Sequence, residues 1–172
     1  MTSSLNPSLS LRMATPEDAP VVFELIQALA DYEKLSASVT GNAAELATHL
    51  EGDRPLVEAV LAEWEGQAVG FALFFTNYST FLTKPGIYLE DLFVRPEHRR
   101  LGIGKALLGY LAAIAQSRQC GRLEWSVLDW NAPAIAFYER IGASVLPDWR
   151  ICRVTGAAIA TLAKQKPGNS PS

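Results

Sequence analysis

Two adjacent carboxylates interrupt an apolar run near the middle of the chain. Glu90 and Asp91 stand between Leu89 and the segment 92–94, whose residue types suit a buried strand. Carboxylates are seldom buried without a partner or a chemical task. A desolvated carboxylate has a raised pKa and can accept a proton near neutral pH. We therefore expect this pair to have a partner or a chemical task. Neighbouring strand residues point to opposite faces, so we expect Asp91 to face away, toward a cation.

Two glycines follow this run at the start of a segment with helical periodicity. Residues 99–105 read Arg-Arg-Leu-Gly-Ile-Gly-Lys and lead into the segment 104–118, whose apolar residues recur on one helical face. Glycine lets the backbone approach a ligand closely, and the free N–H groups of a helix start bind anions. The third glycine of the dinucleotide fingerprint is missing, and so is the Gly-Lys-Ser/Thr of a P-loop. The sequence therefore predicts an anion site of another kind.

A phenol and an amide form a third candidate group. Asn131 and Tyr138 are seven residues apart, about two helical turns, and so lie near one face of the helix expected at 132–141. Asn131 or Asp129 can cap that helix. By spacing alone, Tyr138 and its neighbour Phe137 could equally be ordinary core aromatics.

Three of these segments together resemble the GNAT N-acetyltransferases. Residues 99–104 fit the pattern Gln/Arg-x-x-Gly-x-Gly/Ala, and residues 131–143 fit Asn-x-x-Ala/Ser-x-x-Phe-Tyr-x-x-x-Gly-Ala/Phe. With Leu-Glu-Asp-Leu-Phe-Val at 89–94, the similarity extends over residues 12–162. Within the superfamily it is closest to the diamine (spermidine/spermine) and thialysine branch, on the further segments 29–33, 69–72 and 88–94.

The resemblance implies a reaction and a set of site residues. Acetyl-CoA would be the cosubstrate, no metal would be needed, Glu90 would handle the amine proton, and Tyr138 would protonate the departing thiolate. The amine would be held by Tyr32, Glu33, Glu90, Glu124, Trp125 and Ser126. Coenzyme A would be held by Leu92, Phe93, Val94, Arg99, Arg100, Leu101, Gly102, Ile103, Gly104, Lys105, Asn131, Ala132, Pro133, Ala134 and Tyr138. For Tyr32 and Glu33, spacing alone fits an exposed acid beside a half-buried ring equally well.

The nature of the amine stays open. A long polyamine carries several positive charges, yet residues 67–89 contain no Asp or Glu, and the acidic Asp-Pro-Trp of polyamine acetyltransferases is absent. A smaller diamine or an amino acid such as thialysine or lysine fits as well, and Lys84 or Arg150 could then meet its carboxylate. Two other functions remain: acetylation of a protein or peptide amine, and non-catalytic binding of acetyl-CoA.

Composition limits the number of domains, the partners and the localisation that the sequence allows. With 172 residues, 49% of them apolar, and a net charge of −3, the chain suits one domain and does not favour nucleic acid or an anionic membrane as partner. We expect a single GNAT domain at 9–163, a flexible start at 1–8 and a disordered tail at 164–172. Two cysteines without metal-like spacing favour a cytoplasmic protein. A homodimer is expected from the resemblance.

Strands and helices interleave along the chain, which predicts an α/β fold, and the resemblance makes its sheet mostly antiparallel and twisted, with helices on both faces. We expect strands at 9–13, 56–64, 67–76, 88–94 and 123–128, and a last strand or pair of strands at 143–154. We expect helices at 15–32, 42–50, 104–118, 132–141 and 155–163, and a loop at 77–86.

Overall fold

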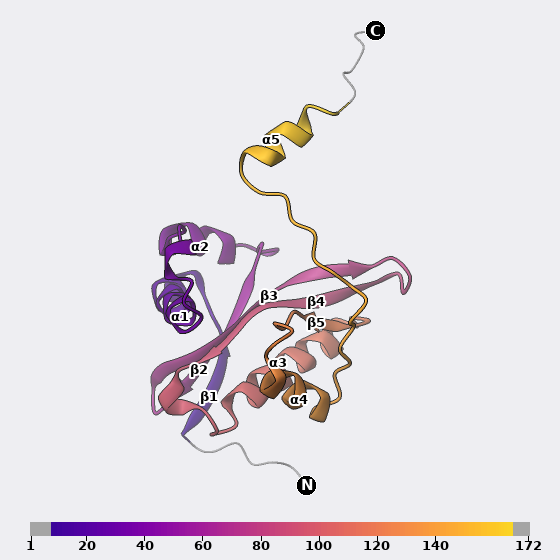
Figure 1. Cartoon of the computed structure of the whole chain (residues 1–172). Helices are drawn as coiled ribbons and strands as arrows, with labels where there is room; N and C mark the ends of the chain where they lie inside the picture. Colours follow the sequence, from indigo (N-terminus) through magenta and orange to yellow (C-terminus); the bar gives the residue numbers. More distant parts are fainter. Residues whose placement is uncertain (1–7, 167–172) are drawn as a thin grey trace. The chain divides into compact units, whose positions relative to one another are not determined.

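The computed structural model describes residues 8–166 and is shown in Figure 1. Contacts divide the chain after Ser126 into two units, which are described one at a time. The expectations for the two chain ends fall largely on residues 1–7 and 167–172, outside the described part.

A five-stranded sheet organises the first unit. Its order is that of the sequence: β1 (Leu9–Met13), β2 (Glu58–Trp64), β3 (Gln67–Ser79), β4 (Lys84–Val94) and β5 (Leu123–Trp125). Each neighbouring pair is antiparallel except β4 and β5, which are parallel. Glu65 and Gly66 join β2 to β3 with φ values of 50° and 81°, the left-handed conformation that a two-residue hairpin turn requires. The predicted mixed, mostly antiparallel sheet is confirmed.

Helices cover both faces of this sheet (Figure 1). On one face, α1 (Ala19–Tyr32) and α2 (Ala43–Leu50) pack on a core that includes Phe71 and Phe93, which stand opposite each other on β3 and β4. On the other face lies α3 (Ile103–Ser117). There Leu92 comes within 3.8 Å of the place where Gly104 would carry a Cβ. Adjacent residues of β4 thus serve opposite layers.

The first helical segment is fixed by charges as well as by burial. A short 3-10 turn (Pro16–Asp18) precedes α1, with Thr15 and Asp18 bonded as a capping box. Arg12 on β1 donates to both oxygens of Asp18, at 2.7 and 2.8 Å. The start of α1 is therefore tied to the sheet edge.

The segment 77–86 was predicted as a loop, and this is wrong. β3 continues to Ser79 and β4 begins at Lys84, so only residues 80–83 turn. Pro85 is tolerated because its backbone faces away from β3: its carbonyl accepts the N–H of Gly121 instead. Proline is tolerated in a strand at a position where a backbone N–H would have no acceptor on the neighbouring strand.

The second unit holds α4 (Ala132–Arg140) and α5 (Ala157–Ala163). The strand predicted at 143–154 is not formed, and that stretch is irregular. An extended segment becomes a strand only by pairing with another one, and residues 127–166 provide none. The strand predicted at 123–128 likewise ends at Trp125. No helix in residues 8–166 is long and apolar enough to cross a membrane.

Candidate active site

Glu90 occupies a β-bulge. Leu73 of β3 pairs with Asp91, while the next residue, Phe74, pairs with Leu89, so Glu90 is the extra residue of β4. A bulge interrupts the alternation of side chains and is frequent beside active sites. The prediction that Glu90 and Asp91 face opposite sides assumed regular alternation, and the bulge removes that assumption. Asp91 shares a face with Leu73, which belongs to the core under α1.

Asp91 is the carboxylate at the bulge whose pKa is raised. Burial, followed by the negative charges of Glu90 and Glu33, raises the pKa of Asp91 to about 6. We call Glu33, Glu90 and Asp91 the carboxylate cluster. The cation expected beside Asp91 is not seen: no ion pair of the described residues includes it. The cluster therefore offers concentrated negative charge to a protonated amine.

An arginine joins the start of the glycine turn to the end of α1. The guanidinium of Arg99 lies 4.1 Å from the ring centre of Tyr32 and 5.8 Å from that of Phe93. Its Nε donates to the backbone oxygen of Val94 at 3.0 Å. The predicted coenzyme A residue Arg99 and the predicted amine residue Tyr32 are thus in contact with each other. Sequence spacing held no signal for this pairing.

Beyond Leu89, no strand of residues 8–166 pairs with the outer edge of β4. β5 ends at Trp125, opposite Leu89, whereas β4 continues to Val94. Ile87 donates outward to Arg122, and Arg95 donates inward to Val69. Successive backbone N–H groups of a strand point alternately to its two sides. Counted back from Arg95, the N–H groups of Leu92 and Val94 therefore point outward, and that of Phe93 points toward β3. Leu92 and Val94 can therefore donate to an acyl oxygen or an amide of a ligand lying along this edge.

The glycine turn has the geometry of an anion site. Arg100 and Gly102 have φ values of 64° and 81°, and α3 follows without a side-chain cap. The N–H of Ala106 is the first to bond within the helix, to Gly102. The three N–H groups of residues 103–105 have no acceptor in the described part of the chain. Such N–H groups, at the positive end of the helix dipole, bind phosphate.

Gly104 tests whether a ligand belongs there. Its φ is not in the left-handed region, and an added Cβ would meet only Cδ2 of Leu92, at an ordinary 3.8 Å. Neither conformation nor packing inside the protein requires glycine at this position. Glycine there leaves room for a bulky anion to approach the start of α3, so the residues present fit the diphosphate of coenzyme A. Arg100 and Lys105 are exposed and add positive charge beside it.

The predicted substrate residues of β5 divide between the two faces. Glu124 pairs with Tyr88, and the hydroxyls of Tyr88 and Ser126 lie 2.7 Å apart, on the face that also carries Asp91. The rings of Phe75 and Tyr88, 5.2 Å apart, form an aromatic wall there. Trp125 stands opposite Leu89, on the face of α3. The structure therefore gathers Glu124 and Ser126, but not the side chain of Trp125, on the face of the carboxylate cluster.

In the second unit, Asn131 and Tyr138 lie at the two ends of α4. Oδ1 of Asn131 accepts the N–H of Ala134 at 3.3 Å, so the predicted cap is confirmed. Burial raises the pKa of Tyr138, whose ring centre lies 5.5 Å from that of Phe137. A phenol with a raised pKa stays protonated at neutral pH and can donate its proton.

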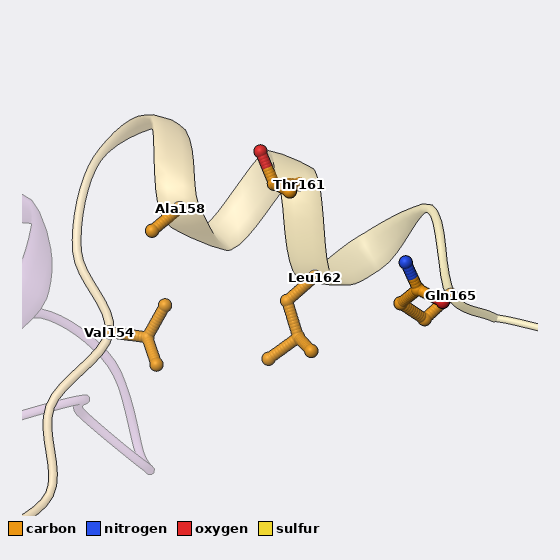
Figure 2. Close-up of a pocket in the computed structure, with 5 residues that line it drawn as sticks. All are labelled: Val154, Ala158, Thr161, Leu162 and Gln165. Atoms are coloured by element: carbon orange, nitrogen blue, oxygen red, sulfur yellow. The ribbon is translucent and has the colours of Figure 1, made fainter.

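An open groove in the same unit carries none of these groups. Figure 2 shows the five residues that line its volume of about 400 Å³: Val154, Ala158, Thr161, Leu162 and Gln165. The lining contains no ionisable side chain and no residue of the motifs. Among residues 8–166, no three His, Cys, Asp or Glu side chains are placed to share a metal ion.

The bulged strand, the open edge and the glycine turn together define an acyl-CoA-binding fold. Residues 24–143 match the model of the acetyltransferase (GNAT) family, and the chain belongs to that family. It is accordingly a GNAT-type N-acetyltransferase, a family that uses acetyl-CoA.

Named relatives act on small amines. The chain is 34% identical to L-ornithine N5-acetyltransferase NATA1 of Arabidopsis thaliana, over 90% of the chain and 87% of that protein. It is 35% identical to thialysine N-epsilon-acetyltransferase of Caenorhabditis elegans, over 88% of the chain and 94% of that protein. Among solved structures, an integron cassette protein from the mobile metagenome of V. cholerae superposes with a TM-score of 0.75 at 26% identity, covering 93% of this chain and all 100% of that one.

Proposed function

We propose that this protein transfers the acetyl group of acetyl-CoA directly to a primary amine of a small molecule, of the kind that ornithine and thialysine carry in their side chains. The observation that carries the proposal is the carboxylate cluster at the bulge of β4. One of its members, Asp91, has a pKa of about 6, and the outward N–H groups of Leu92 and Val94 follow it along the same strand.

The amine reaches the site protonated, since the pKa of an alkyl ammonium lies near 10. The negative charge of Glu33, Glu90 and Asp91 attracts it. Glu90, exposed at the bulge, then takes the proton directly or through a water molecule, with Asp91 as the second carboxylate of the pair. The pKa of Asp91, about 6, leaves this carboxyl ionised at pH 7 yet more basic than an ordinary aspartate.

The neutral amine attacks the thioester carbonyl, and a C–N bond forms. The carbonyl oxygen becomes an oxyanion that the N–H groups of Leu92 and Val94 can stabilise. The C–S bond then breaks, the thiolate takes the phenol proton of Tyr138, and the extra proton of the new C–N nitrogen is released to restore the phenol. The backbone of residues 100–105 would hold the diphosphate, and residues 131–134 would hold the remainder of coenzyme A. No covalent enzyme intermediate is needed.

The substrate assay measures thiol release from acetyl-CoA with ornithine, lysine, thialysine, putrescine, spermidine and short peptides. We expect turnover with free amines and a mono-N-acetyl product in mass spectrometry. Turnover confined to peptides would replace this proposal by protein acetylation. Acetyl-CoA binding without turnover of any amine would leave only a binding module.

Two further properties belong to the proposal. We expect a homodimer, which sedimentation at micromolar concentration tests, and a monomer there would contradict it. We expect a cytoplasmic protein, in keeping with Cys120 and Cys152, both free thiols.

A further inference from the structure

A pair of opposite charges lies at the start of β5, on the face that also carries Asp91: Arg122 directly precedes the strand, and Glu124 belongs to it. Nε of Arg122 is 2.7 Å from Oε2 of Glu124, a close charge contact in which the N–H is not aligned for a hydrogen bond. The same Oε2 accepts Nδ2 of Asn77 at 2.9 Å. Nη2 of Arg122 donates to the backbone oxygen of Tyr78 at 3.3 Å. Each charged group is thus held by a second contact from β3.

The neighbouring strand makes room for this arrangement. A Cβ on Gly86 would lie 2.4 Å from Oδ1 of Asn77 and 3.1 Å from Cγ of Arg122. Only glycine lets both side chains cross β4 at this point, because no real Cβ comes that close to an oxygen. The geometry of the Arg122–Glu124 pair therefore depends on the absence of a side chain at position 86, unlike that of a chance surface ion pair.

Both members of the pair remain accessible to a ligand. The side chains of Arg122 and Glu124 are 38% and 34% exposed. Nη1 of Arg122 has no acceptor within residues 8–166, so it can still donate. A carboxylate ligand would accept from the guanidinium, and an ammonium ligand would donate to Glu124. The pair is complementary to a zwitterion, not to a molecule with positive charge alone.

The distance to the carboxylate cluster suits an amino acid with a basic side chain. Glu124 stands beside Tyr88, and Glu90 lies two residues further along β4. With a rise of roughly 3.3 Å per residue and a strand spacing of about 4.8 Å, their Cα atoms are separated by roughly 8 Å. Five extended bonds, from the side-chain nitrogen of lysine to its α-carbon, span roughly 6 Å. The rings of Phe75 and Tyr88 lie on this face and can pack against the methylene groups between them.

We infer that Arg122 and Glu124 recognise the α-carboxylate and the α-ammonium of an amino-acid substrate whose side-chain amine is acetylated at the carboxylate cluster. This assignment rests on the proposed function and adds the residues that select an amino acid over a diamine. A diamine lacks the carboxylate and brings a second cation next to Arg122, which costs binding.

The test uses three substrates that differ in one end only. Lysine carries both α-groups, cadaverine lacks the carboxylate, and 6-aminohexanoate lacks the α-amine. Arg122→Met should raise the KM for lysine and 6-aminohexanoate about tenfold or more, while kcat changes little and the KM for cadaverine stays the same or falls. Glu124→Gln should raise the KM for lysine by a larger factor than the KM for 6-aminohexanoate, which has no α-ammonium to lose a partner.

Arg118→Met provides the matched control. Arg118 also pairs with a glutamate, Glu58, at 2.6 Å, but it caps the far end of α3. This variant should leave all three KM values unchanged. Calorimetric titration of lysine onto the enzyme saturated with coenzyme A gives a readout independent of turnover, and we expect heat of binding for the wild type but not for Arg122→Met.

Equal effects of Arg122→Met on lysine and cadaverine would overturn the inference, and so would unchanged lysine binding. If Arg122→Met does not fold, Arg122→Lys takes its place. Its shorter side chain offers a single donor group, so it should raise the KM for lysine by a larger factor than the KM for cadaverine. Absence of turnover with every free amine would instead refute the proposed function, so the two failures are distinguishable.

Discussion

Replacing Asp91 by asparagine should make the protein more stable and less active. In the unfolded chain Asp91 ionises with a pKa near 3.8, whereas in the folded protein its pKa is about 6. The folded state thus holds a proton that the unfolded state has lost, and the free energy of unfolding falls as the pH rises from about 4 to about 6. The loss persists at higher pH.

The size of the effect follows from the shift. The difference of about 2 pKa units corresponds to up to about 3 kcal/mol at pH 7, since each unit is worth about 1.4 kcal/mol. Asparagine keeps the shape without the charge. We therefore expect Asp91→Asn to exceed the wild type in stability at pH 7 by up to about 3 kcal/mol, and to match it near pH 4.

Urea unfolding between pH 4 and pH 8 measures this difference, and a thiol-release assay should show a decrease in kcat/KM of about 100-fold. Asp18→Asn is the opposite control. The hydrogen bonds from Arg12 hold the pKa of Asp18 well below its usual range, so its ionised form stabilises the fold at neutral pH. That variant should lose stability at pH 7. An Asp91→Asn protein no more stable than the wild type at pH 7 would refute the account of burial and like charge.

The remaining predictions concern the cofactor turn and the two proton-handling groups. Gly104→Ala should weaken acetyl-CoA binding measured by calorimetry and leave thermal stability equal or higher, whereas Gly109→Ala, also in α3 with open space around it, should only stabilise the helix by about 0.5–1 kcal/mol. Equal acetyl-CoA affinity in both variants would remove the ligand argument for Gly104. Tyr138→Phe should lower kcat about 100-fold with an unchanged dissociation constant for acetyl-CoA, and unaltered turnover would exclude the phenol as acid. Glu33→Gln should shift the acidic limb of the kcat/KM profile to lower pH, because it removes one of the charges that raise the pKa of Asp91, and an unmoved limb would contradict that coupling.

The sequence predicts most elements because burial and periodicity decide them. The caps at Thr15, Asn42 and Asn131, the hairpin at residues 65–66 and the helix after Gly102 form where residue types favour them. These signals are local, so they can be found without knowing the partner across the fold.

The errors arise where a neighbour decides the outcome. A bulge depends on the register between two strands, so adjacency could not reveal that Glu90 is the extra residue or that Asp91 is the buried one. Pro85 suggested a loop, but it lies where β4 needs no donor. The segment 143–154 was predicted to be extended, yet strand formation needs a partner in space.

Motifs predicted more of the candidate site than chemical reasoning from single residues did. The glycine turn and the Glu90–Asp91 pair stand out in the sequence because glycines and adjacent acids are unusual in apolar surroundings. The contact of Arg99 with Tyr32 and the dependence of Arg122 on Gly86 join residues distant in the sequence, and only the fold reveals them.

The pH dependence of kcat/KM, measured with acetyl-CoA and two amines of different basicity such as lysine and thialysine, tests the central claim most directly. We predict an acidic limb near pH 6 that is the same for both amines, since it belongs to the carboxylate pair at the bulge, and that is lost or displaced in Asp91→Asn. An acidic limb that follows the pKa of the amine, or one that Asp91→Asn leaves in place, would contradict proton transfer to this pair.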